Sequence, residues 1–194
     1  MKNNDFNMTG NKQLMDTKLF VYDLCGFAIT QIRKCEESTE YGAHTFKLNN
    51  LNVLFRAAKT TPTKTGQFVT LWKRGENGLI QPYDISDDID FFIISVQKDD
   101  NFGQFVFPKS VLCEKEIVSK SHAGGKRAMR VYPPWDKTTS KQAKKTQSWQ
   151  LEYFLNIPKD KSPDFSLVRT LYQQTHHERR GYGLCPKPLA NNKK

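Results

Sequence analysis

The sequence contains no long apolar run. Its longest purely apolar stretch is about four residues, around Phe91–Ile94, whereas a helix that spans a bilayer needs about 20. The first residues, Met1–Gln13, are polar and rich in asparagine, with no apolar run that ends in a small-residue cleavage site. We therefore expect no membrane span and no secretory signal, and we predict a cytoplasmic protein.

Sequence motifs of common catalytic centres are also missing. There is no GxSxG or comparable elbow for a hydrolase nucleophile. Gly124–Gly125–Lys126 resembles part of a phosphate loop, but neither the earlier glycine nor the following Ser or Thr of GxxxxGK[ST] is present. A nucleotide-hydrolysing loop is excluded, and two interpretations of the segment remain. Its backbone N–H groups hold a phosphate beside Lys126 and Arg127, or it is a plain solvated loop.

Cysteine is scarce and irregularly spaced. The four cysteines form no CxxC pair, so we expect reduced thiols, three of them packed inside. His176 and His177 with Cys185 lack the ligand spacing of a structural zinc site, and we predict no metal and no cofactor. The acidic run from Asp84 to Asp90 leaves two interpretations open: carboxylates that gather a metal ion, or a polar strand entry that faces water.

Positive charge is present in excess and is unevenly distributed. The chain has 30 Lys and Arg against 20 Asp and Glu, a net charge of +10. Residues 51–80 carry a balance of +4 and residues 121–150 one of +6, while residues 81–120 carry −4. Clustered cations are typical of phosphate-binding proteins, because released counterions supply much of the affinity. A basic surface that only maintains solubility is the other interpretation.

Hydrophobic periodicity predicts an α/β or α+β fold with one core. Helical spacing indicates helices over Gln13–Cys25, Ser140–Leu155 and Asp164–His176, with a short helix at Ser110–Glu116. Strands are predicted at Phe27–Arg33, Ala43–Leu48, Asn52–Lys59, Gln67–Arg74, Ile80–Tyr83, Asp90–Val96, Gln104–Phe107 and Ala128–Tyr132. Asp90–Val96 is the most apolar and is expected to be a central strand buried on both faces. We predict a flexible N-terminus over residues 1–12, a single domain over 13–180 and a mobile basic tail over 181–194.

Two basic segments, Asn52–Arg74 and Lys126–Trp149, alternate cations with aromatic side chains. Lys and Arg hold phosphates, and flat rings offer stacking surfaces for bases. Trp135 follows two prolines and is the best candidate for an exposed ring, whereas Phe68, Trp72 and Trp149 are expected in the core. The candidate nucleic-acid contacts are Arg56, Lys59, Lys64, Lys73, Arg74, Lys126, Arg127, Arg130, Trp135, Lys141 and Lys145.

Five long strings of the sequence resemble those of a known family. They are FRAAKTTPTKTGQFVTLWKR (55–74), IDFFIISV (89–96), GQFVFPKSVL (103–112), GKRAMRVYPPWD (125–136) and KQAKKTQSWQLEYF (141–154). Through them the chain resembles the MepB-like family over roughly Gln13 to Ile157. The family is widespread in bacteria, and its best-known member is encoded beside a multidrug efflux pump and its repressor. The resemblance implies a restriction-endonuclease-like α/β fold, a mixed and partly antiparallel sheet flanked by helices.

The implied fold provides a test for a nuclease. In nucleases of that class, an acid stands two residues before a lysine, and this acid holds a metal ion beside the lysine. Lys73 and Lys109 are the candidate lysines, but Leu71 and Phe107 stand where the acid is required. The remaining candidate acids, which would have to approach from elsewhere, are Glu37, Glu40 and Asp90.

The main hypothesis is therefore binding of DNA or RNA through phosphate contacts, tolerant of sequence and without cleavage. A Mg²⁺- or Mn²⁺-dependent nuclease with a rearranged site is one alternative. Binding of a small anion or drug, suggested by the efflux neighbourhood of the family, is the other.

Overall fold

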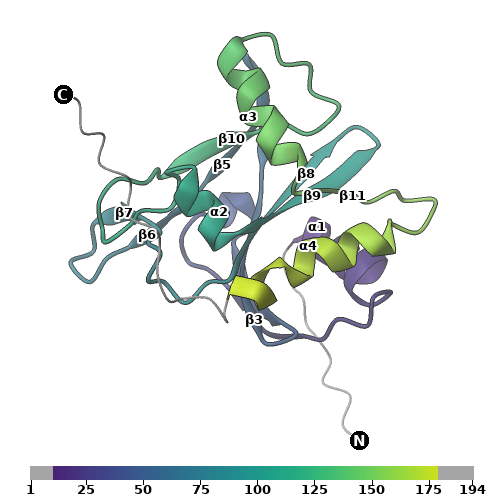
Figure 1. The fold of residues 1–194 in the computed structure, drawn as a ribbon, viewed down its shortest axis with the longest axis horizontal. Helices are drawn as coiled ribbons and strands as arrows, with labels where there is room; N and C mark the ends of the chain where they lie inside the picture. The colour runs from purple at the N-terminus through teal and green to yellow at the C-terminus, as the bar shows by residue number, and fades with distance from the viewer. Residues whose placement is uncertain (1–10, 179–194) are drawn as a thin grey trace, which may run out of the picture.

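A six-stranded mixed sheet forms the centre of the molecule in this computed structural model, which describes residues 11–178 (Figure 1). Its strands lie in the order β1 (Ile29–Lys34), β2 (His44–Leu48), β3 (Leu51–Ala57), β8 (Phe91–Lys98), β9 (Asn101–Pro108) and β11 (Phe154–Asn156). Strands β3 and β8 run parallel, and the other neighbouring pairs run antiparallel. The predicted mixed, partly antiparallel sheet is confirmed.

Strand β8 is buried on both faces, as its sequence predicts. Phe91 and Ile93 pack into one hydrophobic cluster, whereas Phe92 and Ile94 pack into a second cluster on the opposite face. Successive side chains of a strand point to opposite sides, so an uninterrupted apolar run needs cover on both. The sheet therefore separates two cores.

Helices cover one face of the sheet. The N-terminal helix α1 (Lys12–Thr17) continues as the π-helical turn η1 (Lys18–Tyr22), and α4 (Phe165–Glu178) packs beside them. Asp164 caps α4 by accepting a hydrogen bond of 3.0 Å from the Leu167 N–H, as expected from its place after Pro163. The predicted helices at both ends of the domain are confirmed.

The opposite face carries a second sheet and two further helices. This three-stranded sheet has the order β10 (Ala128–Val131), β5 (Lys64–Thr70) and β4 (Lys59–Thr61). Helices α2 (Lys109–Glu114) and α3 (Lys141–Leu151) lie on the same side of the molecule, as Figure 1 shows. A hairpin of β6 (Trp72–Arg74) and β7 (Ile80–Pro82) extends from one end, and the turn η2 (Thr39–Tyr41) precedes β2.

Two predicted elements have different boundaries. The strand expected over Gln67–Arg74 is interrupted at Leu71, whose N–H donates to the Arg127 carbonyl, and the chain passes from β5 into the hairpin. The helix expected over Ser140–Leu155 ends at Leu151 and is followed by β11. Phe154 and Leu155 fill opposite cores there, so burial against β9 outweighs local helical spacing.

Some predictions concern residues at the ends of the chain. Asn11 already caps α1, so the N-terminal segment expected to be flexible gives way to a helix at Lys12. Residues 1–10 of that segment, the tail over 181–194 and Cys185 lie outside the described residues. Between residues 11 and 178, no helix is long and apolar enough to cross a membrane.

Candidate nucleic-acid interface

The outward face of the three-stranded sheet carries alternating cations and aromatic rings. Arg130 on β10 lies opposite Phe68 on β5, and Phe68 lies opposite Lys59 on β4. The Arg130 guanidinium stands over the Phe68 ring, 5.8 Å from its centroid, and Lys59 Nζ stands 4.9 Å from the centroid of Tyr41. The Tyr41 and Phe68 rings meet edge to face at 6.2 Å. We call Arg130, Phe68, Tyr41 and Lys59 the cation–aromatic row.

The pleat of the strands explains why these side chains face outward. Val69 and Met129 are buried in the core between the two sheets, so their neighbours Phe68 and Arg130 take the other face. Phe68 is half-buried and belongs to neither core cluster. The expectation that Phe68 is a core residue was therefore wrong.

Arg130 also fixes the turn between β4 and β5. Its guanidinium donates 3.0 Å to the Gly66 carbonyl and 2.9 Å to Thr61 Oγ1. Gly66 has φ +84°, and a Cβ there would lie 2.5 Å from a ring carbon of Tyr132, so the position requires glycine. These acceptors are neutral, and the positive charge of Arg130 is held in place without being neutralised.

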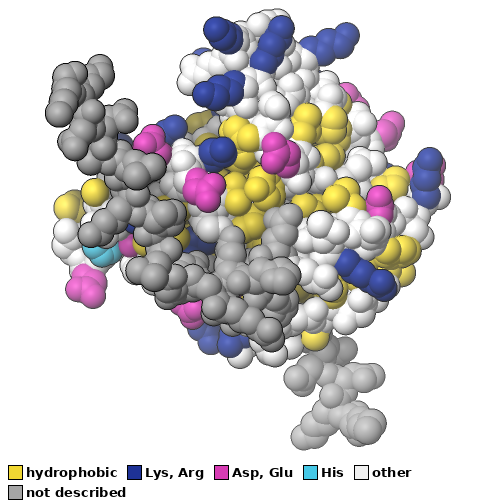
Figure 2. Space-filling view, viewed as in Figure 1, with side chains coloured by type: hydrophobic (Ala, Val, Ile, Leu, Met, Phe, Trp, Pro, Cys, Tyr) yellow, Lys and Arg dark blue, Asp and Glu magenta, His cyan; other side chains and the backbone are white. Residues whose placement is uncertain are grey.

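Two further predicted cations, Lys64 and Arg127, lie at the ends of the small sheet. The Arg127 carbonyl accepts a hydrogen bond from the N–H of the buried Leu71, so the pleat directs the Arg127 side chain away from the face that carries the row. The strand register puts Lys64 at one end of β5 and Arg127 near the other, about 20 Å apart at ~3.3 Å per residue. Within residues 11–178, no carboxylate lies within 4.0 Å of the charged groups of these two residues, Lys59, Arg130 or the exposed lysines of the neighbouring loop and helix. Those exposed lysines are Lys126, Lys141 and Lys145. Figure 2 shows dark-blue side chains gathered over α3.

Two of the predicted contacts do not belong to this surface. Arg56 is fully buried on β3, where its guanidinium donates to the Phe55 carbonyl at 2.9 Å and to the Tyr83 hydroxyl at 3.2 Å. The Trp135 ring packs edge-on against Phe154 at 5.6 Å, and its Nε1 is buried. The predictions of a surface Arg56 and an exposed Trp135 ring were wrong, because both side chains complete the core.

The two predicted cations of the hairpin, Lys73 and Arg74, both interact with neighbouring groups of the protein. The Lys73 ammonium forms an ion pair with Asp87. The Arg74 guanidinium lies 5.7 Å from the ring centroid of Trp72 and donates to the Gly78 carbonyl at 3.0 Å. Trp72 is half-buried and lies outside both core clusters, so the expectation that it is a core residue was also wrong.

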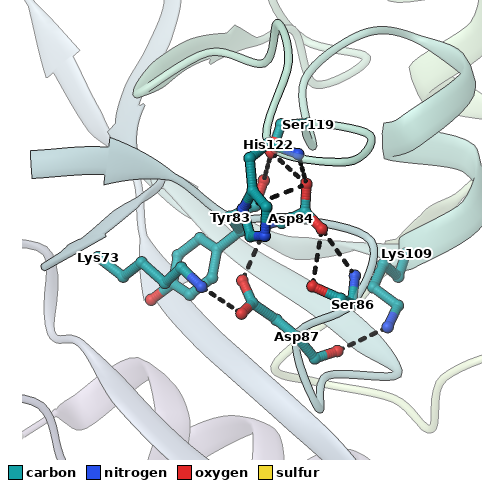
Figure 3. A network of polar contacts seen from close by, with 8 residues as sticks. All are labelled: Lys73, Tyr83, Asp84, Ser86, Asp87, Lys109, Ser119 and His122. Atoms are coloured by element: carbon teal, nitrogen blue, oxygen red, sulfur yellow. Dashed lines mark hydrogen bonds and ion pairs between the residues drawn. The ribbon is translucent and has the colours of Figure 1, made fainter. Parts of the chain in front are cut away.

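A polar cluster beside the hairpin gathers both lysines considered for a nuclease (Figure 3). Lys73 pairs with the Asp87 carboxylate, and Lys109 Nζ donates to the Asp87 backbone carbonyl at 2.6 Å. The Asp90 carboxylate instead accepts a hydrogen bond of 2.7 Å from the Asn52 N–H. In the described part of the chain, Glu37 and Glu40 form no ion pair with either lysine. Asp87 is an acid that the fold brings to both lysines, and the backbone carbonyl of Asp90 accepts a hydrogen bond of 3.0 Å from the Lys109 N–H. The place of Asp87 in the acidic run was its signal in the sequence.

Asp84, in the same cluster, holds two loops together. It is 1% exposed and accepts hydrogen bonds from the N–H and Oγ of Ser86, from Ser119 Oγ and from the His122 N–H, at 2.7–3.0 Å. Burial raises the pKa of this carboxyl, but the four donors outweigh burial and keep the pKa well below its ordinary value. Asp84 thereby anchors the loop that leads to Lys126 and Arg127. No group of three or more His, Cys, Asp or Glu side chains in the described residues is close enough together to hold a metal ion.

Comparisons with known proteins give one family. A model of the family described as MepB-like matches residues 35–156. The crystal structure of MepB is similar with a TM-score of 0.66 and 35% sequence identity, covering 78% of this chain and 99% of that chain. A bacterial homing endonuclease, I-Ssp6803I, gives a TM-score of 0.37 at 14% identity over 71% of this chain and 82% of its own, too low a likeness to indicate a shared activity. No curated protein matches the sequence.

Proposed function

The chain belongs to the MepB-like family, and from this premise we propose that it binds DNA or RNA through phosphate contacts on the three-stranded sheet. The observation that best supports this proposal is the cation–aromatic row. It places two cations and one ring on adjacent strands and a second ring, Tyr41 of η2, beside them, the combination that holds a phosphate backbone and offers rings for base stacking.

The spacing of the flanking cations supports an extended ligand. Lys64 and Arg127 lie at opposite ends of the small sheet, about 20 Å apart along the strand. A duplex carries about one negative charge per 1.7 Å of its axis, so a track of that length faces several phosphates. A ligand with a single charged group would leave most of these cations unused.

Lysines elsewhere in the molecule differ from the cations of the small sheet in their ion pairing. Lys12, Lys18 and Lys159 each lie within 4.0 Å of an aspartate, whereas the cations of the sheet lie that close to none of the carboxylates between residues 11 and 178. Like charges held together without acids repel, and a polyanion relieves that repulsion while releasing its counterions. Binding of this type depends on charge and tolerates sequence.

The test is the salt dependence of binding, measured by fluorescence anisotropy with a labelled duplex and a labelled single strand. The variant K59Q/K64Q/R127Q removes three cations that have no carboxylate partner in the described part of the chain. Each phosphate contact contributes about 0.9 to the slope of log K against log salt on a duplex, so the slope becomes shallower by about 3 if all three bind.

The matched control is K12Q/K18Q/K159Q, which removes the same net charge from ion-paired lysines. We expect its salt slope to equal that of the wild-type protein. If wild-type binding is absent at low salt, or if both triple variants change the slope equally, the sheet is not a nucleic-acid interface.

A metal-dependent nuclease is the second candidate, favoured by the convergence of Lys73 and Lys109 on Asp87. Supercoiled plasmid incubated with the protein and Mg²⁺ or Mn²⁺ tests it against an EDTA control. Nicking that is lost in Asp87→Asn and retained in Asp88→Asn would support this candidate. No nicking above the EDTA control would eliminate it.

A further inference from the structure

A pocket opens between α3, β10 and the end of α2. Its volume is about 350 Å³, and Lys115, Lys126, Arg130, Tyr132, Thr146 and Trp149 are among its lining residues. The α3 residues in the lining include Ala143, Thr146 and Trp149, which recur every three positions and therefore share one side of the helix. The pocket is thus built by a helix face and a sheet edge far apart in sequence.

The charge of the pocket is of one sign. Three cations line it, and no Asp or Glu is among the described lining residues. Lys115 Nζ is held 5.6 Å from the Trp149 ring centroid, whereas the bonds of Arg130 to Gly66 and Thr61 turn its guanidinium over the small sheet. Cations placed in advance around a concave site lose little freedom when an anion enters.

Size and lining restrict the ligand. A volume near 350 Å³ lies at the lower end of the ~300–1,000 Å³ range of small-ligand sites, far too small for a duplex. Tyr132 and Trp149 add flat apolar surface, and Thr146 adds a hydroxyl. An anion with one planar ring matches this set better than inorganic phosphate, which would leave the rings unused.

We infer that this pocket takes one nucleotide unit of a single strand, with its phosphate between Lys115 and Lys126 and its base against the aromatic lining. The inference rests on the proposed function, because Arg130 lines the pocket while its guanidinium stands in the cation–aromatic row next to it. A strand that follows the row thereby reaches the pocket with one nucleotide turned inward, a position that bases in a stacked duplex cannot take.

The test fills the pocket without changing its charge. Ala143→Trp places a large side chain in the lining, and the matched control Ser148→Trp adds the same side chain at an exposed α3 position outside the lining. We expect Ala143→Trp to weaken single-strand binding about tenfold, the size of one lost base stack, and to leave duplex binding within about twofold. Ser148→Trp should change neither affinity.

A second pair of variants covers the case in which Ala143→Trp does not fold. Lys126→Gln removes a pocket cation and Lys144→Gln removes an exposed α3 cation outside the lining. Only Lys126→Gln should reduce the preference for a single strand over a duplex. Circular dichroism melting of every variant checks the fold.

Thymidine monophosphate serves as a direct probe in saturation-transfer NMR, with thymidine as its uncharged counterpart. We expect a signal from the monophosphate that disappears in Ala143→Trp, and a weaker signal from thymidine. If strands bind but Ala143→Trp and Lys126→Gln behave like their controls, the pocket is overturned and the proposed function stands. Binding of the monophosphate without any strand would overturn the proposed function and support the pocket as a nucleotide site.

Discussion

The carboxylate of Asp84 accepts a hydrogen bond of 2.8 Å from the backbone N–H of His122, 38 residues later in the chain. His122 and its neighbour Ser121 both have positive φ, near 60° and 52°, a backbone conformation that costs about 1–3 kcal/mol per residue unless the surroundings impose it. The buried carboxylate supplies that constraint. The loop that carries Lys126 and Arg127 therefore depends on an acid that touches neither of them.

Replacement of Asp84 by asparagine should loosen this loop. The amide cannot accept from all four donors, so we expect a loss of about 2–4 kcal/mol in the free energy of unfolding. Hydrogen exchange of residues 119–127 should accelerate more than that of β8. Asp88→Asn is the control, since Asp88 is exposed and, within residues 11–178, its carboxylate accepts a hydrogen bond only from the Asn52 side chain. Equal exchange in both variants would show that Asp84 does not anchor the loop.

The same carboxyl predicts how stability varies with pH. Its folded-state pKa lies below the ordinary value of 3.8, so its contribution is complete above that value and is lost as pH falls toward the folded-state pKa. Urea unfolding between pH 7 and pH 2 should show stability falling below about pH 4, and the fall should be smaller in Asp84→Asn. Parallel curves for the two proteins would contradict this assignment.

The elements that the sequence predicts well are those whose burial is decided locally. Strand β8 has apolar side chains on both faces, and α4 has both its cap and its apolar stripe within one short segment. The end of α3 is different. Residues after Leu151 continue an acceptable helical pattern, and only pairing with β9, some 50 residues earlier, makes Phe154–Asn156 a strand.

Exposure of single side chains was harder to predict than the basic character of the surface. Alternation along β3 suggests an outward Arg56, but this strand has a core on each side and offers no outward position. Phe68 was expected to be buried and Trp135 to be exposed, and both expectations were wrong for a similar reason. The outward face of the small sheet leaves Phe68 partly open, and Phe154 of β11 covers Trp135.

Replacement of Arg130 is expected to change nucleic-acid binding, whereas replacement of Arg56 is expected to change stability. Arg130→Met should weaken duplex binding and lower the salt slope by about 1, because one phosphate contact is lost. Arg56→Met should leave the slope unchanged and instead reduce stability by about 1–3 kcal/mol, since the Phe55 carbonyl and Tyr83 hydroxyl lose a buried donor. Anisotropy titrations and urea unfolding of both variants measure these effects. A slope change in Arg56→Met would return that residue to the interface.

Phe68 separates stacking from charge within the cation–aromatic row. Phe68→Leu keeps an apolar side chain against Tyr41 and leaves every cation in place, but it removes the flat ring beneath Arg130. We expect single-strand affinity to fall about tenfold, since one base stack is worth about 1–3 kcal/mol, while the salt slope stays constant. Phe165→Leu, an exposed ring on α4 at the opposite face, is the matched control and should have no effect. If the slope falls together with the affinity, Phe68 acts by positioning Arg130. If the affinity does not change, the strand contacts the cations alone.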